Sequence, residues 1–288
     1  MNKYLIVTDT TSAMSLDIAN EYGIELISLS VLLDGQEYKD QQDISTEELY
    51  QYLKDDQTPS TSQPNTGYLI EKMEQWQKEN YDAIIIITCS SDLSGTNNGF
   101  HLARDTVGLE NVYIYDSRQV GAPVMDMAIT AKKMADEGHD VDSIMKMLEE
   151  KTAHSFSFLH PDNFKQLSRS GRLSPMAARM GTMLKIKALL CLDEKGQSVD
   201  KYGMCRTEAK MGKMIVDKFK EDGVNSDEYK IYICHADNAK RATAAKLLFH
   251  TMFPGIEVET HLLPAVLTCH GGLGCVSYHY TYKGKGNL

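Results

Sequence analysis

Ile84-Ile85-Ile86-Ile87 runs directly into Thr88-Cys89-Ser90-Ser91-Asp92-Leu93-Ser94-Gly95-Thr96, so an apolar segment ends in a loop of hydroxyls and small side chains. A continuous apolar run is typical of a parallel strand that is covered on both faces. A shorter hydroxyl-rich stretch, Ser60-Thr61-Ser62-Gln63-Pro64, precedes it in the chain. Ligands of open α/β sheets bind at the carboxyl ends of the strands, so both stretches are candidate recognition loops. Their neutral donors suit an acidic or phosphorylated ligand.

Predicted strands and helices alternate through the first half of the chain. Apolar runs predict strands at residues 4–8, 24–33, 84–87 and 112–115. Helical spacing and capping residues predict helices over residues 14–22 (capped by Thr11-Ser12), from 45 onward, and over 69–76, 100–107, 124–137 and 141–151. This alternation implies a mainly parallel sheet with right-handed crossovers.

The order becomes less regular beyond residue 150. Strands are predicted at residues 156–158, 188–192, 199–205, 231–234, 256–263 and 276–282, and helices at 176–184, at 239–252 and in a segment that ends at Ser170. Glu194-Lys195-Gly196 predicts a turn that joins the strands 188–192 and 199–205 in a hairpin. The predicted fold class is therefore α/β with two domains. Residues 1–150 form a Rossmann-like domain whose mainly parallel sheet is flanked by helices, and residues 151–288 form a mixed α/β domain.

Composition excludes several classes of partner. The 288 residues include 40 acidic and 30 basic side chains, for a net charge of -10, which disfavours nucleic acid and anionic membranes because both are bound through Lys and Arg. The N-terminal apolar run is too short for a signal peptide, and no run approaches the roughly 20 residues that span a bilayer. We expect a soluble, cytoplasmic chain whose six cysteines are reduced and mostly buried.

Four short motifs carry candidate binding residues. Ser94-Gly95-Thr96 precedes a predicted helix, so its hydroxyls and the free backbone N–H groups converge on one point, although a simple helix cap would have the same residues. Thr61-Ser62 is open to the same alternative. His270 lies in Cys269-His270-Gly271-Gly272-Leu273-Gly274, whose glycines either admit a ligand to the backbone or only form a turn. Arg172 is a candidate anion ligand or a solvated surface charge.

Together these motifs resemble the DegV family, whose members include the acyl-binding subunit of bacterial fatty acid kinase. The resemblance covers nearly the whole chain, and the order and spacing of the motifs are more specific than any one of them. In chain order the motifs are Asp9-Thr10-Thr11-Ser12, Thr61-Ser62-Gln63-Pro64, Leu93-Ser94-Gly95-Thr96, Asp116-Ser117, Gly171-Arg172-Leu173-Ser174, His235-Ala236-Asp237 and His270 with its glycines.

The resemblance implies a binding function for these motifs. Two α/β domains would close over one long-chain fatty acid in a buried tunnel at their interface. The hydroxyls of Thr61, Ser62 and Ser94 would hold its carboxylate, and His270 would lie nearby. The ligand-binding residues it implies are Thr61, Ser62, Ser94, Gly95, Thr96, His270 and Gly271.

The resemblance also implies a protein partner. Arg172, with His270, would support phosphotransfer when a separate ATP-binding kinase subunit makes acyl phosphate. Arg172 and Arg206 would belong to the face that docks this subunit. The chain itself would then be non-catalytic alone and need no cofactor, because ATP and Mg²⁺ would bind only to the kinase. The family segment HTGPG reads His270-Gly271-Gly272-Leu273-Gly274 here, and the family Lys-Pro reads Lys187-Ala188. Because Gly271 replaces the Thr of the family segment, one possible ligand hydroxyl is lost. The alternative that the chain is a lipid carrier without a kinase partner therefore stays open.

Three rival classes have weaker support. A serine hydrolase would use Ser94 or Ser62, but neither lies in a GxSxG motif, and the HGG stretch follows the serines where an oxyanion loop should precede them. A nucleotide enzyme lacks both GxxxxGK and GxGxxG. Cys234-His235 and Cys269-His270 lack the ligand spacing of structural zinc sites, so we expect no metal.

Overall fold

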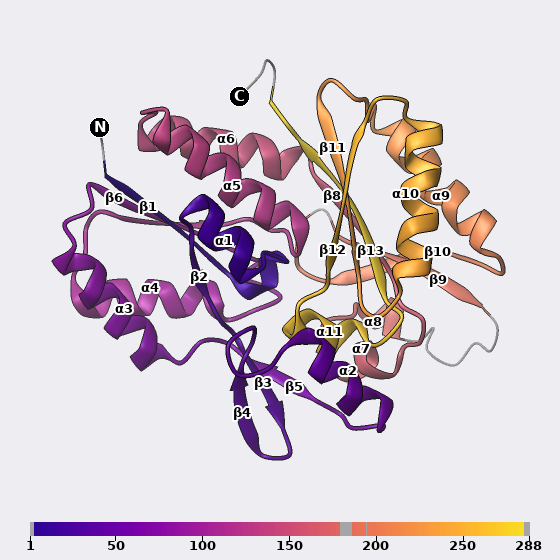
Figure 1. The fold of residues 1–288 in the computed structure, drawn as a ribbon, viewed down its shortest axis with the longest axis horizontal. Helices are drawn as coiled ribbons and strands as arrows, with labels where there is room; N and C mark the ends of the chain where they lie inside the picture. Colours follow the sequence, from indigo (N-terminus) through magenta and orange to yellow (C-terminus); the bar gives the residue numbers. More distant parts are fainter. Residues whose placement is uncertain (1–2, 179–185, 194, 285–288) are drawn as a thin grey trace.

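The computed structural model describes residues 3–178, 186–193 and 195–284, and these residues form three β-sheets with helices between and around them (Figure 1). The strands are β1 (Tyr4–Asp9), β2 (Glu25–Ile27), β3 (Ser30–Leu33), β4 (Gln36–Lys39), β5 (Ser60–Ser62), β6 (Ala83–Thr88), β7 (Val112–Asp116), β8 (Phe156–His160), β9 (Lys187–Leu192), β10 (Val199–Cys205), β11 (Tyr229–His235), β12 (Glu257–Leu262) and β13 (Val276–Tyr282). The helices are the 3-10 turn η1 (Thr10–Ser12), α1 (Leu16–Tyr22), α2 (Thr46–Lys54), α3 (Thr66–Lys78), α4 (Thr96–Val107), α5 (Ala122–Asp136), α6 (Val141–Ala153), α7 (Lys165–Arg169), α8 (Pro175–Ala178), α9 (Glu208–Glu221), α10 (Ala239–Met252) and α11 (Ala265–Gly271).

The first sheet is parallel, in the order β2-β1-β6-β7. Because successive strand residues point to opposite faces, the isoleucines of β6 divide between two cores. Ile84 and Ile86 pack with the core residues of α3 and α4, whereas Ile85 and Ile87 pack with those of α1, α5 and α6. The sheet is therefore covered on both faces, as the continuous apolar run predicted.

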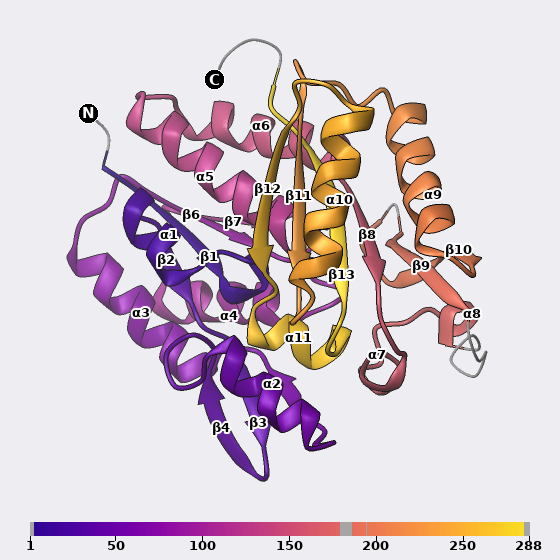
Figure 2. The same cartoon turned by 45° about the vertical axis from the view of Figure 1, so that its right-hand side comes forward.

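The second sheet is mixed, in the order β10-β9-β8-β13-β11-β12. Tyr278, Tyr280 and Tyr282 of β13 pack on one face, in a core that also contains residues of α9 and α10. The other face meets α5, which contacts β1 and β6 of the first sheet as well as β11 and β13 of the second. Helix α5 thus lies between the two large sheets (Figure 2).

A buried ion pair joins the helices between the sheets to the second sheet. Lys151 Nζ donates to Asp126 Oδ2 and to the Tyr282 carbonyl, each at 2.6 Å, and Tyr232 Oη donates to Asp126 Oδ1 at 2.7 Å. The positive charge of Lys151 helps to hold the pKa of Asp126 below its usual value although burial opposes this. Helix α6 extends across the domain boundary predicted at residue 150, and that boundary stays a prediction.

The third sheet is small and antiparallel, in the order β4-β3-β5. Its apolar side packs with α2 and α11 in one core, which contains Val31, Leu49 and Val266. This packing brings β5, from the first quarter of the chain, against α11, from its end.

Two predictions for the first 33 residues are wrong. Residues 24–33 form two strands in different sheets, β2 and β3, because side chains satisfy the backbone at the bend between them: Ser28 Oγ donates to the Asp40 carbonyl at 2.8 Å, and the Leu29 N–H donates to Thr10 Oγ1 at 3.1 Å. Thr11-Ser12 does not cap α1. Those residues form η1, and Ser15 is the cap, accepting from the Ile18 N–H at 3.2 Å.

Other predictions are confirmed. The α/β class is correct, and β9 and β10 form the predicted antiparallel hairpin. All six cysteines are free, and five of them are buried. The predicted helix 176–184 begins as α8, and its remainder lies outside the described residues. Within the described chain, none of the helices is long and apolar enough to cross a membrane.

Candidate functional site

The strand order of the first sheet creates a crevice between two loops. From β1 the chain moves outward to β2, and from β6 it moves outward in the opposite direction to β7. The loops after β1 and β6 therefore diverge at a topological switch point, which is where ligands of open α/β sheets bind. Thr11 follows β1 there, and Cys89, Leu93 and Ser94 follow β6.

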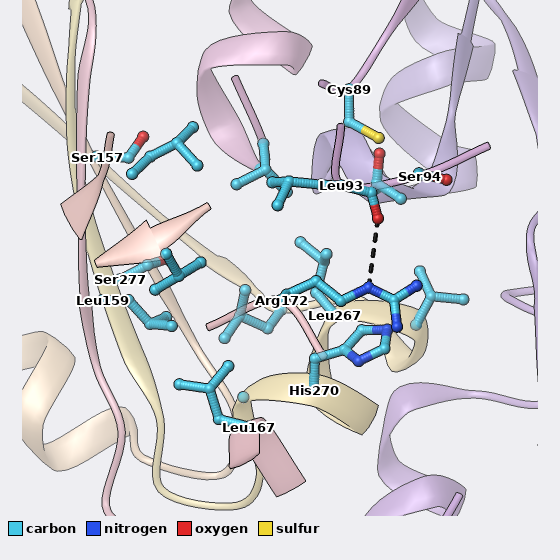
Figure 3. A pocket seen from close by; sticks show the side chains of 18 of the residues that line it. Cys89, Leu93, Ser94, Ser157, Leu159, Leu167, Arg172, Leu267, His270 and Ser277 are labelled. Carbon is cyan, nitrogen blue, oxygen red and sulfur yellow. Dashed lines mark hydrogen bonds between the residues drawn. The ribbon is translucent and has the colours of Figure 1, made fainter. Parts of the chain in front are cut away.

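A narrow, mostly apolar cavity starts at this crevice (Figure 3). Its empty space is about 960 Å³ including the opening to solvent. We call this cavity the slot, and its mostly apolar lining suits a hydrocarbon chain. The apolar residues that line it are Leu29, Cys89, Leu93, Val120, Phe158, Leu159, Leu167, Leu192, Val199, Leu263, Val266 and Leu267, and the polar ones are Thr11, Thr61, Ser94, Ser157, Arg172, His270, Ser277 and His279.

Thr61 and His270 meet at one end of the cavity. Thr61 Oγ1 lies 2.8 Å from Nε2 of His270. Thr61 is on β5 and His270 is on α11, so the common core of the small sheet and α11 sets this distance. Both side chains line the cavity, and together they form a neutral hydrogen-bonding group at its wall.

Arg172 supplies positive charge at the same end. Its Nε donates to the Leu93 carbonyl at 3.3 Å, its Nη1 donates to the Ser170 carbonyl, and in the described part of the chain it forms no ion pair. Burial, and then the nearby charge of Arg172, lower the pKa of His270 to about 4. His270 is therefore neutral at pH 7, and Arg172 carries a charge that a ligand carboxylate can balance.

The Ser94-Gly95-Thr96 loop completes this end of the cavity. Ser94 Oγ lies 2.9 Å from Thr96 Oγ1 and accepts from the Thr96 N–H at 3.4 Å, so Ser94 turns toward the start of α4. Gly95 lies against the other hydroxyl-rich loop, because a Cβ at this position would lie 1.7 Å from Oε1 of Gln63 unless that side chain moved. Two loops that are distant in the sequence are thereby packed together beside Thr61.

The sequence-predicted site residues do not all lie in the cavity. Thr61, Ser94, Arg172, His270 and Gly271 all line the cavity. Gly95 instead lines a surface groove that shares Leu93, Ser94 and Arg172 with the cavity, and Thr96 is buried at the start of α4. Ser62 follows Thr61 on β5, so it points to the other face of that strand, and its hydroxyl donates to the Gln63 carbonyl at 3.1 Å. Arg206 is exposed after β10, away from the cavity lining.

Comparison with known proteins identifies the family. The family model described as "Uncharacterised protein, DegV family" matches residues 3–283. The chain belongs to the DegV family. A DegV domain-containing protein of Listeria innocua is 27% identical over 98% of this chain and 99% of its own length.

Two solved DegV structures are close to this fold. A DegV family protein from Thermus thermophilus is described as binding fatty acid. It superposes with a TM-score of 0.89 at 25% identity, and the match covers 97% of this chain and 99% of the Thermus chain. DegV from Bacillus subtilis is described as a fatty acid binding protein. It superposes with a TM-score of 0.86 at 27% identity, and the match covers 98% of this chain and 100% of the Bacillus chain. Both proteins bind fatty acids.

The space beside Gly271 of this DegV protein is limited by a neighbouring cysteine. A Cβ on Gly271 would lie 2.9 Å from Sγ of Cys275, so Cys275 occupies the space that a larger side chain at position 271 would need. Thr61 and His270 are the hydrogen-bonded polar pair on the wall that Gly271 shares.

Sequence reasoning missed a second polar group in the cavity. Ser157, Ser277 and His279 line it, and none of them was predicted as a site residue. The last strand carried a signal, because Ser277 and His279 alternate with the buried tyrosines of β13. Alternating polar and apolar side chains are also typical of a strand with one face in water. The sequence alone therefore does not indicate that the face with Ser277 and His279 is buried.

The described residues show no arrangement suited to a metal ion. Across residues 3–178, 186–193 and 195–284, His, Cys, Asp and Glu side chains do not gather in groups of three or more that could hold one. Burial raises the pKa of Cys89, Cys234 and Cys269 well above the usual value, so these thiols stay protonated near pH 7. Recognition by hydrogen bonds, one positive charge and apolar packing is what this arrangement can provide.

Proposed function

We propose that this DegV protein binds one long-chain fatty acid, with the tail in the slot and the carboxylate at Thr61, Ser94, Arg172 and His270. The observation that carries this proposal is the charge distribution of the cavity. Its walls are mostly apolar, and Arg172, without an ion-pair partner among the described residues, lies at one end beside the Thr61–His270 pair. The fatty acid binding of the Thermus and Bacillus relatives supports the same ligand class.

The tail supplies most of the binding free energy in this arrangement. Burying about 15 methylene groups at roughly 0.8 kcal/mol each contributes on the order of 12 kcal/mol before the loss of chain and rigid-body entropy. A carboxylate costs several kcal/mol to desolvate unless it is hydrogen-bonded or paired. The polar end of the cavity therefore offsets a penalty and fixes the orientation of the head group.

The head group would be presented to a separate ATP-dependent kinase subunit that converts it to acyl phosphate. A surface groove supports this step, because it shares Leu93, Ser94 and Arg172 with the cavity. Its other lining residues are Ser91, Asp92, Gly95, Gly171, Leu173, Gln197 and Ser198. A carboxylate beside Ser94 and Arg172 would thus lie close to the molecular surface, where a second protein can approach it. Arg172 would stabilise negative charge during phosphotransfer, and exposed Arg206 would contact the kinase.

Calorimetric titration with palmitate tests the binding part of this proposal. Leu267 lines the cavity, so Leu267→Trp fills the slot and should weaken binding at least tenfold. Leu102 is 53% exposed on α4, so Leu102→Trp is the matched control and should bind like the wild type. Equal binding by the two variants would place the ligand elsewhere and contradict the proposal.

A reconstituted reaction tests the kinase part separately. The palmitate-loaded chain is mixed with a purified ATP-binding fatty acid kinase subunit and ATP, and acyl phosphate is trapped as the hydroxamate. Product should form only when both proteins are present, and Arg172→Met should abolish it. A chain that binds palmitate but yields no product with its cognate kinase subunit would be a lipid carrier.

A serine hydrolase has less support. The hydrogen-bond partner of Ser94 is Thr96, and His270 pairs with Thr61, so in the described chain neither Ser94 nor Ser62 has a hydrogen-bonded histidine to activate it. Labelling of Ser94 by a fluorophosphonate would restore this alternative.

A further inference from the structure

A second polar cluster lines the cavity far from the carboxylate end. Ser157 and Ser277 lie on one side of the cavity in Figure 3, and Ser94, Arg172 and His270 lie on the other, with leucines between them. His279 connects the two serines: its Nδ1 is 2.8 Å from Ser157 Oγ, and its Nε2 is 2.8 Å from Ser277 Oγ. We call these three residues the distal cluster.

Strand register places the distal cluster on one face of the second sheet. His279 of β13 is directly opposite Ser157 of β8, and Ser277 is two residues away on the same strand and so on the same face. The three residues are 3%, 5% and 4% exposed, so they are shielded from bulk water yet line the cavity. A polar group in this position faces whatever part of the ligand reaches the far end of the slot.

The distal cluster keeps hydrogen-bonding capacity that its own members do not use. A neutral imidazole has one donor and one acceptor nitrogen. If Ser157 donates to Gln119 Oε1, 3.4 Å away, then His279 donates to Ser157 and accepts from Ser277, whose oxygen can still accept. If Ser157 donates to His279, then His279 donates to Ser277, whose proton is not used within the cluster, although the buried Cys234 thiol also lies within hydrogen-bonding reach of Ser277. A ligand hydroxyl both donates and accepts, so it completes the cluster in either tautomer.

We infer that the distal cluster is a specificity site for a hydroxyl group on the acyl chain, so that the preferred ligand is a hydroxylated long-chain fatty acid. This inference rests on the proposed function, because the carboxylate end sets which part of the chain reaches Ser277. A plain methylene chain would leave the capacity of the cluster unused at this wall. A ligand hydroxyl at this position would form hydrogen bonds with the cluster, and these would offset the free-energy cost of removing it from water.

Recognition fits the distal cluster better than catalysis does. A general base works best with a pKa near the operating pH, whereas burial lowers the pKa of His279 to about 3. No carboxylate accepts a hydrogen bond from His279 in the described chain, since its ring partners are Ser157 and Ser277. The imidazole therefore stays neutral and serves as a fixed hydrogen-bonding group.

The test compares palmitic acid with its mid-chain hydroxy and ω-hydroxy derivatives by calorimetric titration. The wild type should bind one of the hydroxy acids about tenfold more tightly than palmitic acid, which corresponds to one additional hydrogen bond of about 1.4 kcal/mol. The triple variant Ser157→Ala/Ser277→Ala/His279→Leu removes all three polar groups at once and leaves no unpaired partner within the cluster. It should bind palmitic acid at least as well as the wild type and lose the preference.

A matched control comes from the same face of β13. Thr281 is buried outside the cavity lining, and its hydroxyl has no partner among the described residues, so Thr281→Val should retain the hydroxy-acid preference. Wild-type protein that binds palmitic acid and every hydroxy acid equally would overturn the inference but leave the proposed function intact. Protein that binds none of these acids would overturn both. If the triple variant does not fold, the wild-type ligand series alone decides between these outcomes.

Discussion

Thr61 Oγ1 and His270 Nε2 lie 2.8 Å apart although 209 residues separate them in the chain. The contact requires that β5 pack against α11, so the small third sheet and the last helix position one wall of the cavity together. A substitution that shifts either element should therefore weaken binding of the ligand's carboxylate.

Thr61→Val tests this contact. Valine keeps the shape of threonine but removes the hydroxyl, so His270 loses its hydrogen-bond partner and a bound carboxylate loses a donor. Loss of a hydrogen bond to a charged group costs about 1.5–3 kcal/mol, and we expect the Kd for palmitate to rise about tenfold or more in calorimetric titration. Ser60→Ala, an exposed change on the same strand, is the control. Unchanged affinity of Thr61→Val would remove Thr61 from the site.

Ser94→Ala should separate binding from phosphotransfer. Ser94→Ala removes a single hydroxyl and leaves the Thr61–His270 pair intact, so it should weaken palmitate binding only about two- to fivefold. Acyl phosphate formation with the kinase subunit depends on the head-group position, and misplacement of reacting groups is costly, so its rate should fall much further. Parallel titration and turnover assays check this. Equal losses in both would contradict the division of roles.

Gly95→Ala tests the contact between the two hydroxyl-rich loops. The added Cβ would lie 1.7 Å from Gln63 Oε1, so the Gln63 side chain must move and disturb the neighbouring Thr61. We expect weaker palmitate binding and a lower Tm. Gln63→Ala removes the clash, so the double variant Gly95→Ala/Gln63→Ala should bind more tightly than Gly95→Ala alone. A double variant no better than the single one would show that another contact is responsible.

Asp40 should make stability depend on pH. It lies beneath α11 and accepts from the Val266 N–H at 3.3 Å, and burial raises its pKa from 3.8 to about 7. Because the folded pKa exceeds the unfolded one, its stabilising contribution is full below about pH 4 and is lost as the pH rises through 7. Asp40→Asn cannot ionise, so its Tm relative to the wild type should be higher at pH 8 than at pH 5.

Thermal denaturation at the two pH values checks this prediction. Asp227→Asn, at an exposed aspartate, is the control and should give the same Tm difference from the wild type at both. A Tm difference for Asp40→Asn that is equal at pH 5 and pH 8 would mean that Asp40 ionises normally in the folded protein.

Local sequence patterns were sufficient where one strand or loop defined the structure. The run Ile84–Ile87 predicted a strand covered on both faces, and its isoleucines do divide between two cores. The hydroxyls after that run predicted a ligand site at the strand end, and Ser94 lines the cavity. The strand prediction succeeded because strand periodicity follows from backbone geometry, and the ligand site at the strand end stays a prediction.

Sequence reasoning failed where long-range contacts decide the structure. Residues 24–33 read as one apolar strand, but hydrogen bonds from Ser28 and to Thr10 divide it between two sheets. Ser62 appeared equivalent to Thr61 in the motif, yet the pleat of β5 turns only Thr61 to the cavity. The distal cluster went unnoticed because the burial of Ser277 and His279 depends on α5 covering that face of β13.

Native mass spectrometry of the protein purified from a bacterial host shows directly whether the chain holds a fatty acid. We expect one long-chain fatty acid per chain in the wild type and a largely empty Leu267→Trp variant, because the tryptophan occupies the slot. Wild-type protein that emerges empty under gentle conditions, and takes up neither palmitic acid nor its hydroxy derivatives when they are added, would contradict this expectation.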